Sequence, residues 1–242
     1  MRLRLFGLLT LVAFISACGN KATESNETEE IEVEEQWITL FNGTDFSGWE
    51  MYGPEPFTEH WKIVDGTISC NQGAGEENLG FFRSIMTQQE FGNFELELEY
   101  KISKGGNSGI FYHVVEKDEW GHDYASGPEY QVLDDEFSRS ESEPFKMVAS
   151  NYGMYAPAET KSPNPHMQWN KVKIIYNNGF VEHWLNDEKV LEFIEGSDDW
   201  IERKARSKWA NVESYAAFKK GRISLQNHGD EVYFRNIRIK EL

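Results

Sequence analysis

The stretch Phe94-Glu-Leu-Glu-Leu-Glu-Tyr-Lys-Ile102 decides the fold, because apolar and charged residues alternate along its whole length. Successive side chains of a β-strand point to opposite faces, so a period of two predicts one buried face and one solvated face. Such one-sided burial is typical of antiparallel sheets. The stretch therefore predicts a long strand in an antiparallel sheet that has one face in the core and one face in solvent.

Further strand patterns, separated by turn residues, lie on both sides of this stretch. Upstream, Asp65-Gly66 separates Trp61–Val64 from Thr67–Cys70, and Asp-Gly is a strong signal for a β-hairpin. Downstream, strands are predicted at residues 107–115, 129–133, 169–176, 180–185, 189–193, 222–227 and 232–240. About ten short strands in one domain predict an all-β fold, a sandwich or jelly roll of two antiparallel sheets.

One short helix is predicted near the end of the chain. Ser197-Asp198-Asp199 can cap a helix that runs from Trp200 to about Trp209, since short polar side chains accept hydrogen bonds from the first free backbone amides. The helix carries the basic cluster of the domain: Arg203, Lys204, Arg206 and Lys208. We interpret this cluster as a solvated helix face.

The composition limits the classes of partner. The 242 residues contain 41 acidic and 24 basic side chains, for a formal net charge of −17. So negative a surface repels a phosphate backbone, which argues against nucleic acid as a partner. With only two cysteines, the chain has no disulfide framework, so burial of its many aromatic residues must stabilise it.

The first residues have the pattern of an export signal. Arg2 and Arg4 precede an apolar run, Leu5–Ala17, that is shorter than the roughly 20 residues of a membrane-spanning helix. Ile15-Ser16-Ala17-Cys18 resembles a bacterial lipobox. We therefore predict a lipoprotein signal peptide over 1–17 and lipidation of Cys18, with an ordinary signal peptide as the alternative. The protein is expected to be exported and lipid-anchored to a bacterial membrane, at the periplasmic face or the cell surface.

An acidic, apolar-poor segment follows, over residues 18–36. It cannot bury enough surface to offset the entropy of ordering, so we predict a flexible tether. Residues 37–242 are then a single β-sandwich domain. If Cys18 is acylated, Cys70 is left as a lone thiol, most simply a small buried side chain.

Polar residues on the predicted strands are the candidates for chemistry. In Glu129-Tyr-Gln-Val-Leu-Asp134, Glu129 and Gln131 share one strand face, and Asp134 joins them only if a bulge intervenes. The segment is similar to the two-carboxylate strand of retaining glucanases, and its alternative is an acidic strand on a solvated face. No cofactor is expected; calcium held by Glu129, Asp134 or Asp135 is the alternative.

Other candidates lie on neighbouring strands. Asn107, Gly109, Phe111 and His113 are expected on one face, and glycine there would let a ligand approach the backbone. The remaining polar and aromatic candidates are His183, Gln226, His228 and Trp169. Tryptophan faces can stack on sugar rings while amides bind hydroxyl groups, although most large aromatic residues of a sandwich are core.

Several segments, taken together and in order, resemble a known family. They are Leu40–Trp49, Asn107–Ile110, Glu129–Asp134, Trp169-Asn170, His183–Asn186, Ser207–Trp209, Leu225–Gly229 and Phe234–Ile237. Together they resemble the 3-keto-disaccharide hydrolase domain, and the resemblance covers about residues 37–242. The sequence departs from it at His113, where an arginine is expected, and at Gln168, where a glutamate is usual.

The resemblance implies an enzyme with a concanavalin- or laminarinase-like jelly-roll sandwich that cleaves 3-keto-glycosides by elimination and addition or by direct hydrolysis. The catalytic candidates are Glu129, His183 and Asp134, with Glu129 or His183 as the base. The substrate-binding candidates are Asn107, His113, Gln131, Trp169, Gln226 and His228. The alternatives are a non-catalytic carbohydrate-binding lipoprotein on the same fold and a retaining glucanase-like hydrolase. The expected partners are a carbohydrate and, through the anchor, a membrane; the oligomeric state stays open.

Overall fold

The alternating stretch forms β6 (Phe94–Ile102), in the middle of the larger of two sheets. Its apolar side chains are buried, and its Glu and Lys side chains are partly exposed. It pairs on one side with β9 (Asn170–Asn177) and on the other with β13 (Val232–Glu241), both antiparallel. The predicted half-buried strand is therefore confirmed.

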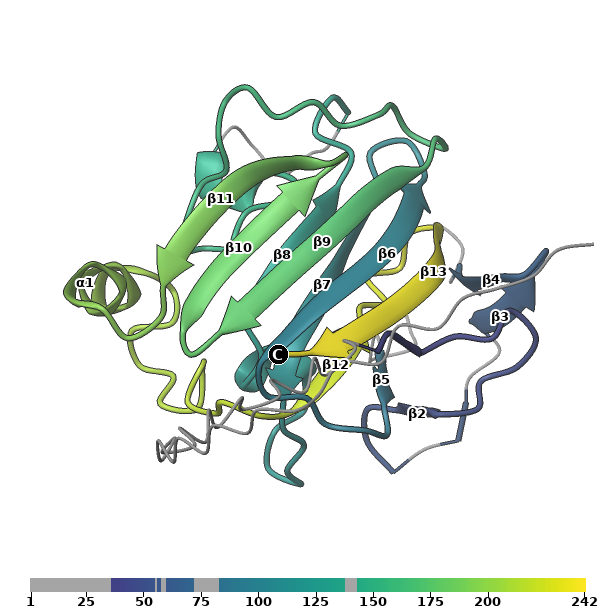
Figure 1. Cartoon of the computed structure of the whole chain (residues 1–242), viewed down its shortest axis with the longest axis horizontal. Helices are drawn as coiled ribbons and strands as arrows, with labels where there is room; N and C mark the ends of the chain where they lie inside the picture. The colour runs from purple at the N-terminus through teal and green to yellow at the C-terminus, as the bar shows by residue number, and fades with distance from the viewer. Residues whose placement is uncertain (1–35, 55, 58–59, 72–82, 138–142) are drawn as a thin grey trace, which may run out of the picture. The chain divides into compact units, whose positions relative to one another are not determined.

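The larger sheet has the strand order β11-β10-β9-β6-β13-β4-β3, and β1 pairs with β13 as well (Figure 1). The strands around β6, β9 and β13 are β1 (Ile38–Thr39), β3 (Trp61–Val64), β4 (Thr67–Cys70), β10 (Phe180–Leu185) and β11 (Glu188–Ile194). Asp65 and Gly66 both have positive φ at the β3–β4 turn, as the Asp-Gly signal predicts.

The smaller sheet has the order β2-β5-β12-β7-β8. Its strands are β2 (Trp49–Met51), β5 (Ile85–Thr87), β7 (Asn107–Val114), β8 (Glu129–Leu133) and β12 (Arg222–Leu225). Figure 1 shows β7, β8 and β12 behind the strands of the larger sheet. The predicted jelly-roll sandwich of two antiparallel sheets is confirmed. β1, β2 and β5 were not predicted, because two or three residues are too few to show an alternation.

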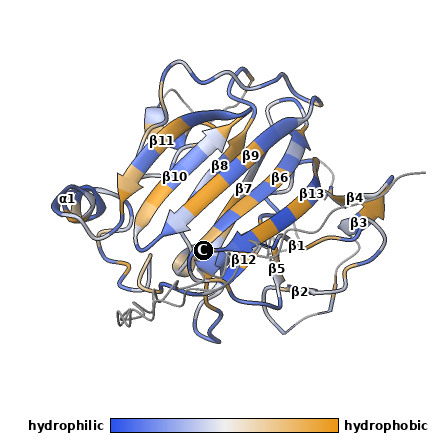
Figure 2. Cartoon of the chain, in the orientation of Figure 1, coloured by the Kyte–Doolittle hydropathy of each residue, from blue (hydrophilic) through white to orange (hydrophobic). Residues whose placement is uncertain are grey.

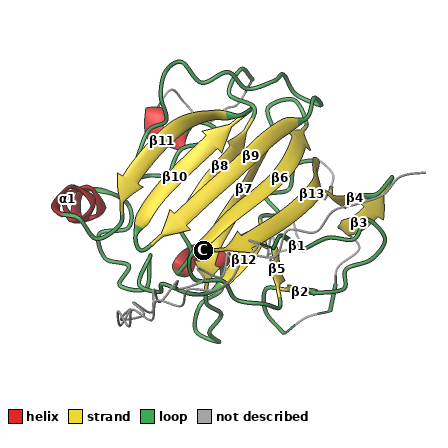
Figure 3. Ribbon diagram, in the orientation of Figure 1, coloured by secondary structure: helices red, strands yellow, loops and turns green. Residues whose placement is uncertain are grey.

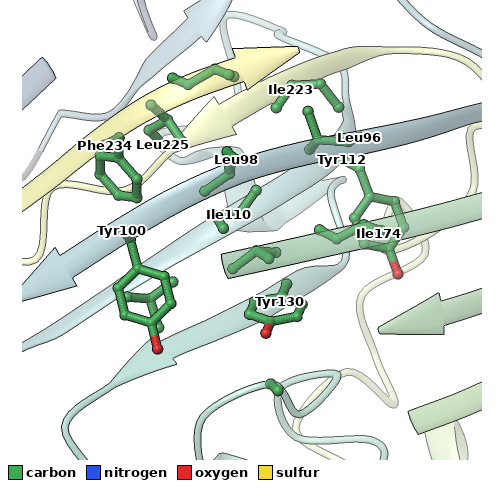
Figure 4. Packing of buried hydrophobic residues seen from close by; sticks show 14 of the residues in the cluster. Leu96, Leu98, Tyr100, Ile110, Tyr112, Tyr130, Ile174, Ile223, Leu225 and Phe234 are labelled. Atoms are coloured by element: carbon green, nitrogen blue, oxygen red, sulfur yellow. The ribbon is translucent and has the colours of Figure 1, made fainter. Parts of the chain in front are cut away.

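The core lies between the two sheets. Figure 4 shows Leu96, Leu98 and Tyr100 of β6 facing Ile110 of β7 and Tyr130 of β8. All five side chains are almost fully buried. Figure 2 shows hydrophobic and hydrophilic residues alternating along the strands of the larger sheet. The side chains of β8 that are not in the core, those of Glu129 and Gln131, consequently project from the opposite face of the smaller sheet.

The single α-helix of the described residues, α1 (Asp198–Arg206), follows β11 and lies beyond it at the edge of the view in Figure 3. The Ser197 side chain accepts a hydrogen bond from the Trp200 amide, as predicted. The helix ends at Arg206 rather than near Trp209. The Ser207 hydroxyl donates to the Lys204 carbonyl and accepts from the Trp209 amide, and these local bonds replace the helical ones.

The computed structural model describes residues 36–54, 56–57, 60–71, 83–137 and 143–242. Cys18, the predicted signal peptide and the predicted tether up to residue 35 lie outside these described residues. Within them, no helix has the length and apolarity needed to cross a membrane. Cys70 is fully buried at the end of β4.

Candidate active site

A cavity of about 330 Å³ opens on the face of the smaller sheet that points away from the core. Its lining includes five of the predicted site residues, from β7, β8 and the segment after β12: Asn107, Glu129, Gln131, Gln226 and His228. β7, β8 and β12 are neighbours in the sheet, so residues far apart in the sequence meet on one surface. The structure therefore brings together most of the polar candidates of these strands.

Glu129 is the most deeply placed ionisable group that the sequence predicted for this cavity, with 5% of its surface exposed. Burial raises the pKa of its carboxyl to about 8; the nearby positive charge of Lys208 acts in the opposite direction. Its carboxylate lies directly over Gly109, where a Cβ atom would come within 2.3 Å of Glu129 Oε1. Glycine at this position therefore makes room for the carboxylate.

Amide side chains line the same cavity. Gln131 Nε2 donates to Asn107 Oδ1 over 3.2 Å, and Asn107 Nδ2 lies 3.3 Å from His228 Nε2. The side-chain oxygens of Gln131 and Gln226 are buried and have no hydrogen-bond partner among the described residues. Such atoms are costly unless a ligand or water pairs with them, so the cavity is suited to a hydroxyl-rich ligand.

A second buried carboxyl, Asp123, lines the same cavity and was not predicted. The backbone amide of Tyr124 and the hydroxyl of Ser224 donate to it over 2.9 and 2.7 Å. Burial raises its pKa above the ordinary value, and these hydrogen bonds act in the opposite direction. No pattern marks Asp123 in the sequence, because it lies in a short 3₁₀ turn (Asp123–Ala125) between strands.

Aromatic rings form part of the wall. The rings of His122 and Tyr124 are stacked with centroids 4.6 Å apart, and Tyr124 is 40% exposed. On another part of the lining, Lys208 Nζ lies 4.0 Å from the centroid of the Tyr152 ring. From the sequence we interpreted Lys208 as part of a solvated basic cluster. In the structure Lys208 instead lines the cavity beside Glu129.

His183 lies in the core and not in this cavity. It is fully buried, its Nδ1 lies 3.0 Å from the Ala149 carbonyl, and its ring centroid is 4.8 Å from that of Tyr130. Burial lowers the pKa of His183 to about 4. A residue on the core face of the larger sheet is separated by the smaller sheet from a substrate bound beside Glu129, so the structure does not bring the predicted base His183 to the site.

His113 is also turned away, by a β-bulge. Its φ of 55° coincides with a register shift in the pairing of β7 with β12. The ring therefore does not share a face with Asn107 and lies in the core instead, 4.3 Å from the Tyr176 ring. Its Nε2 lies 2.9 Å from the Gly92 carbonyl, and burial lowers the pKa of His113 to about 4.

Asp134 and Trp169 lie outside the cavity as well. Asp134 follows the end of β8, accepts a hydrogen bond from the Gly105 amide over 2.7 Å and lines a separate cavity. No bulge in β8 brings it to Glu129, so the two carboxyls do not form the pair of a retaining glucanase. Trp169 is covered by Arg235, whose guanidinium carbon is 3.9 Å from the ring centroid. Within the described ranges, no group of three acidic, His or Cys side chains could hold a metal ion.

A jelly-roll sandwich that holds a buried carboxyl among amides and exposed aromatic rings has the features of a carbohydrate-active protein. The chain belongs to the family described as the 3-keto-alpha-glucoside-1,2-lyase-like domain, whose model matches residues 36–240. The predicted family resemblance is thereby confirmed.

Individual relatives agree with this assignment. The chain is 40% identical over 228 residues to the 3-keto-disaccharide hydrolase of Bacteroides thetaiotaomicron, covering 85% of this chain and 78% of that protein. It is similar to the crystal structure of a candidate glycosyl hydrolase from Parabacteroides distasonis, with a TM-score of 0.77 and 38% identity over 89% of this chain and 97% of that one.

A second such structure from Parabacteroides distasonis, at 24% identity, has a TM-score of 0.66 and covers 86% of this chain and 100% of that one. At this level of identity the likeness shows the fold alone. The family and the 40% identical relative confirm the prediction of a hydrolase of glycosides.

Proposed function

We propose that this protein cleaves 3-keto-glycosides and that Glu129 is the base that starts the reaction. The observation that carries the proposal is the position of Glu129: a carboxyl with a raised pKa, deep in a cavity that is also lined by amide side chains and by Lys208. A carboxylate with a raised pKa is a stronger base than an exposed one, and its pKa lies near neutral pH. The name of the Bacteroides relative supports the class of substrate.

A ketone at C3 makes this single base sufficient, because it acidifies the proton at C2. The Glu129 carboxylate takes that proton, and the electron pair moves to the ketone oxygen to give an enolate. Amide groups of Gln131 and Gln226 can donate hydrogen bonds to the sugar oxygens in this cavity, and stabilising the enolate lowers the barrier.

The enolate then expels the leaving group. The C1–O bond breaks, its electron pair goes to the departing oxygen, and that oxygen takes a proton from the ammonium of Lys208, which lines the cavity beside Glu129. The product is an unsaturated keto-sugar. Addition of water, with a hydroxyl to C1 and a proton to C2, completes a net hydrolysis.

The test is the turnover of 3-keto-trehalose by Glu129→Gln. The substitution keeps the size of the side chain but removes the base, so kcat should fall by about 10²–10⁴-fold, the contribution typical of a general base. A matched carboxyl, Asp134→Asn, lies in the separate cavity and should keep near-normal turnover. Near-normal turnover by Glu129→Gln would remove Glu129 as the base.

The same assay separates the alternatives. A retaining glucanase would cleave unoxidised oligosaccharides and would need Asp134. A non-catalytic binding module would bind 3-keto-sugars in a saturable way and release no product from several such substrates.

The proposal includes a location. The basic start, the short apolar run and the Ser16-Ala17-Cys18 ending support export and attachment of Cys18 to a membrane lipid. Expression of the full chain in a bacterium fed an alkyne-tagged fatty acid should label the protein, and Cys18→Ser should remove the label. Equal labelling of both proteins would refute the anchor.

A further inference from the structure

A second cavity, of about 510 Å³, adjoins the cavity that holds Glu129. The two share two lining residues, Tyr152 and Lys208. The second cavity is bounded on one side by α1 and on the other by the segment 143–154. Both volumes fall within the range of about 300–1,000 Å³ that is usual for small-molecule sites.

The boundary between the two cavities is held in place by the backbone. The Tyr152 amide donates to the Glu129 carbonyl over 3.1 Å, and the Trp209 indole donates to the Tyr152 carbonyl over 3.1 Å. Lys208 Nζ lies 4.0 Å from the Tyr152 ring centroid and 4.3 Å from that of Trp209. The ammonium group is therefore fixed by two rings at the junction of the cavities.

One face of α1 supplies charged groups to the second cavity. Asp199, Glu202, Arg203 and Arg206 are spaced three and four residues apart, so they lie on the same side of the helix. Asp199 pairs with Arg203 at 2.9 Å, and Glu202 pairs with Arg206. Because the charges are balanced in pairs, this face favours neither cations nor anions, but it offers many hydrogen-bond donors and acceptors.

Apolar surface lies opposite that face. Phe145 and Met154 line the cavity together with the Tyr152 ring, and Phe145 is 38% exposed. Gly153, between Tyr152 and Met154, has a φ of 76°, and a Cβ there would lie 3.3 Å from Trp209 Nε1 and 3.8 Å from Lys208 Cε. Balanced polar groups on one side and apolar groups on the other suit a neutral sugar ring, which has hydroxyl edges and C–H faces.

From this geometry we infer that the second cavity binds the leaving sugar of a disaccharide substrate, with the glycosidic oxygen at the junction beside Lys208. The inference rests on the proposed function, since it takes the 3-keto ring to be the one beside Glu129.

The test compares two substrates, 3-keto-trehalose and methyl 3-keto-glucoside, on two variants of α1. Glu202→Trp places an indole in the second cavity. Ile201→Trp adds the same group one residue away, at a position that is 55% exposed and outside the cavity lining. Loss of the exposed pair between Glu202 and Arg206 has little effect on stability, and thermal unfolding of both variants checks this.

In Glu202→Trp, the ratio of kcat/KM for 3-keto-trehalose to kcat/KM for the methyl glycoside should fall at least about tenfold, mainly through KM for the disaccharide. In Ile201→Trp the ratio should stay at the wild-type value. Glucose, the leaving sugar, should inhibit the wild type competitively, and Glu202→Trp should weaken that inhibition.

Each outcome decides a separate point. A wild-type ratio and wild-type glucose inhibition in Glu202→Trp would overturn the subsite while leaving the proposed function intact. A wild-type protein that cleaves neither 3-keto substrate would refute the proposed function, and the subsite with it.

Discussion

Replacing Glu129 by Gln should have opposite effects on activity and on stability, and the effect on stability has a defined dependence on pH. The carboxyl has a pKa of 4.5 as an isolated group and of about 8 in the folded protein, where burial raises it. The folded state therefore holds a proton that the unfolded state releases as the pH rises above 4.5. The glutamine variant has no such titration.

The sign and size follow from linkage. Because the folded pKa is the higher one, the stability contributed by the protonated carboxyl is complete below pH 4.5 and is lost progressively as the pH rises toward 8. Each pH unit in this window costs the wild-type fold about 1.4 kcal/mol, so the cost between pH 4.5 and 7 is about 3 kcal/mol. From pH 4.5 to pH 7, the difference in unfolding free energy between Glu129→Gln and the wild type should therefore shift by about 3 kcal/mol in favour of the variant.

Urea unfolding of both proteins across this pH range measures the difference directly. In thermal unfolding, the same change corresponds to a relative rise in Tm of roughly 10 °C at neutral pH. Glu188→Gln, the same substitution at an exposed carboxyl of β11, serves as the control. A difference for Glu129→Gln that is constant from acid to neutral pH would show that the carboxyl is ionised throughout, and the argument for a strong base would fail.

Four other measurements test the site and the fold. In wild-type protein, kcat/KM should rise with pH toward the pKa of Glu129, about 8, because only the ionised carboxylate accepts the C2 proton; a rate independent of pH in that range would contradict this. Gly109→Ala should lower kcat strongly, since its Cβ would lie 2.3 Å from the Glu129 carboxylate, whereas Gly92→Ala, whose Cβ meets nothing closer than 3.6 Å, should not. Asp123→Ala removes the acceptor of buried donors and should destabilise the fold by about 2–4 kcal/mol in urea unfolding. In a full-length Cys18→Ser protein, Cys70 should react with a thiol reagent only on unfolding, because burial raises its pKa and covers it; fast labelling of the native protein would contradict the structure.

The sequence predicted the strands well where the alternation was long. β6 shows the period of two over nine residues, and its neighbours β9 and β13 were located from similar patterns. Alternation reports burial on one face, so it succeeds wherever a sheet has one wet side. It fails for β2 and β5, because these strands are three residues long and nearly all of their side chains are buried.

The sequence correctly predicted which side chains share a face of a strand only where that strand is regular. Glu129 and Gln131 of β8 project together as expected, because β8 pairs with β7 without a shift in register. His113 does not share the face of Asn107, because a bulge adds a residue to β7 opposite β12. Bulges depend on a local backbone conformation that no residue type imposes, so a histidine with positive φ leaves no signal in the sequence.

The residues that the sequence missed lie on connections rather than on strands. Asp123 and Lys208 reach the cavity from a 3₁₀ turn and from the segment after α1, and their places depend on tertiary packing. Periodicity carries no information about such segments. What marks these residues is a combination of burial and charge, which appears only once the chain is folded.

The position of His113 also changes what a departure from the family pattern means. An arginine is expected at this position, and a histidine in a substrate cavity would alter recognition of the sugar. The His113 ring instead packs against Tyr176 in the core and lies close to the Gly92 carbonyl. The departure therefore alters packing behind the smaller sheet and leaves the polar groups around Glu129 in place. For this reason His113→Ala should lower the unfolding free energy, as loss of a buried side chain does, while the KM for a 3-keto-glycoside stays within a few-fold of wild type; a large rise in KM would place the residue in substrate recognition after all.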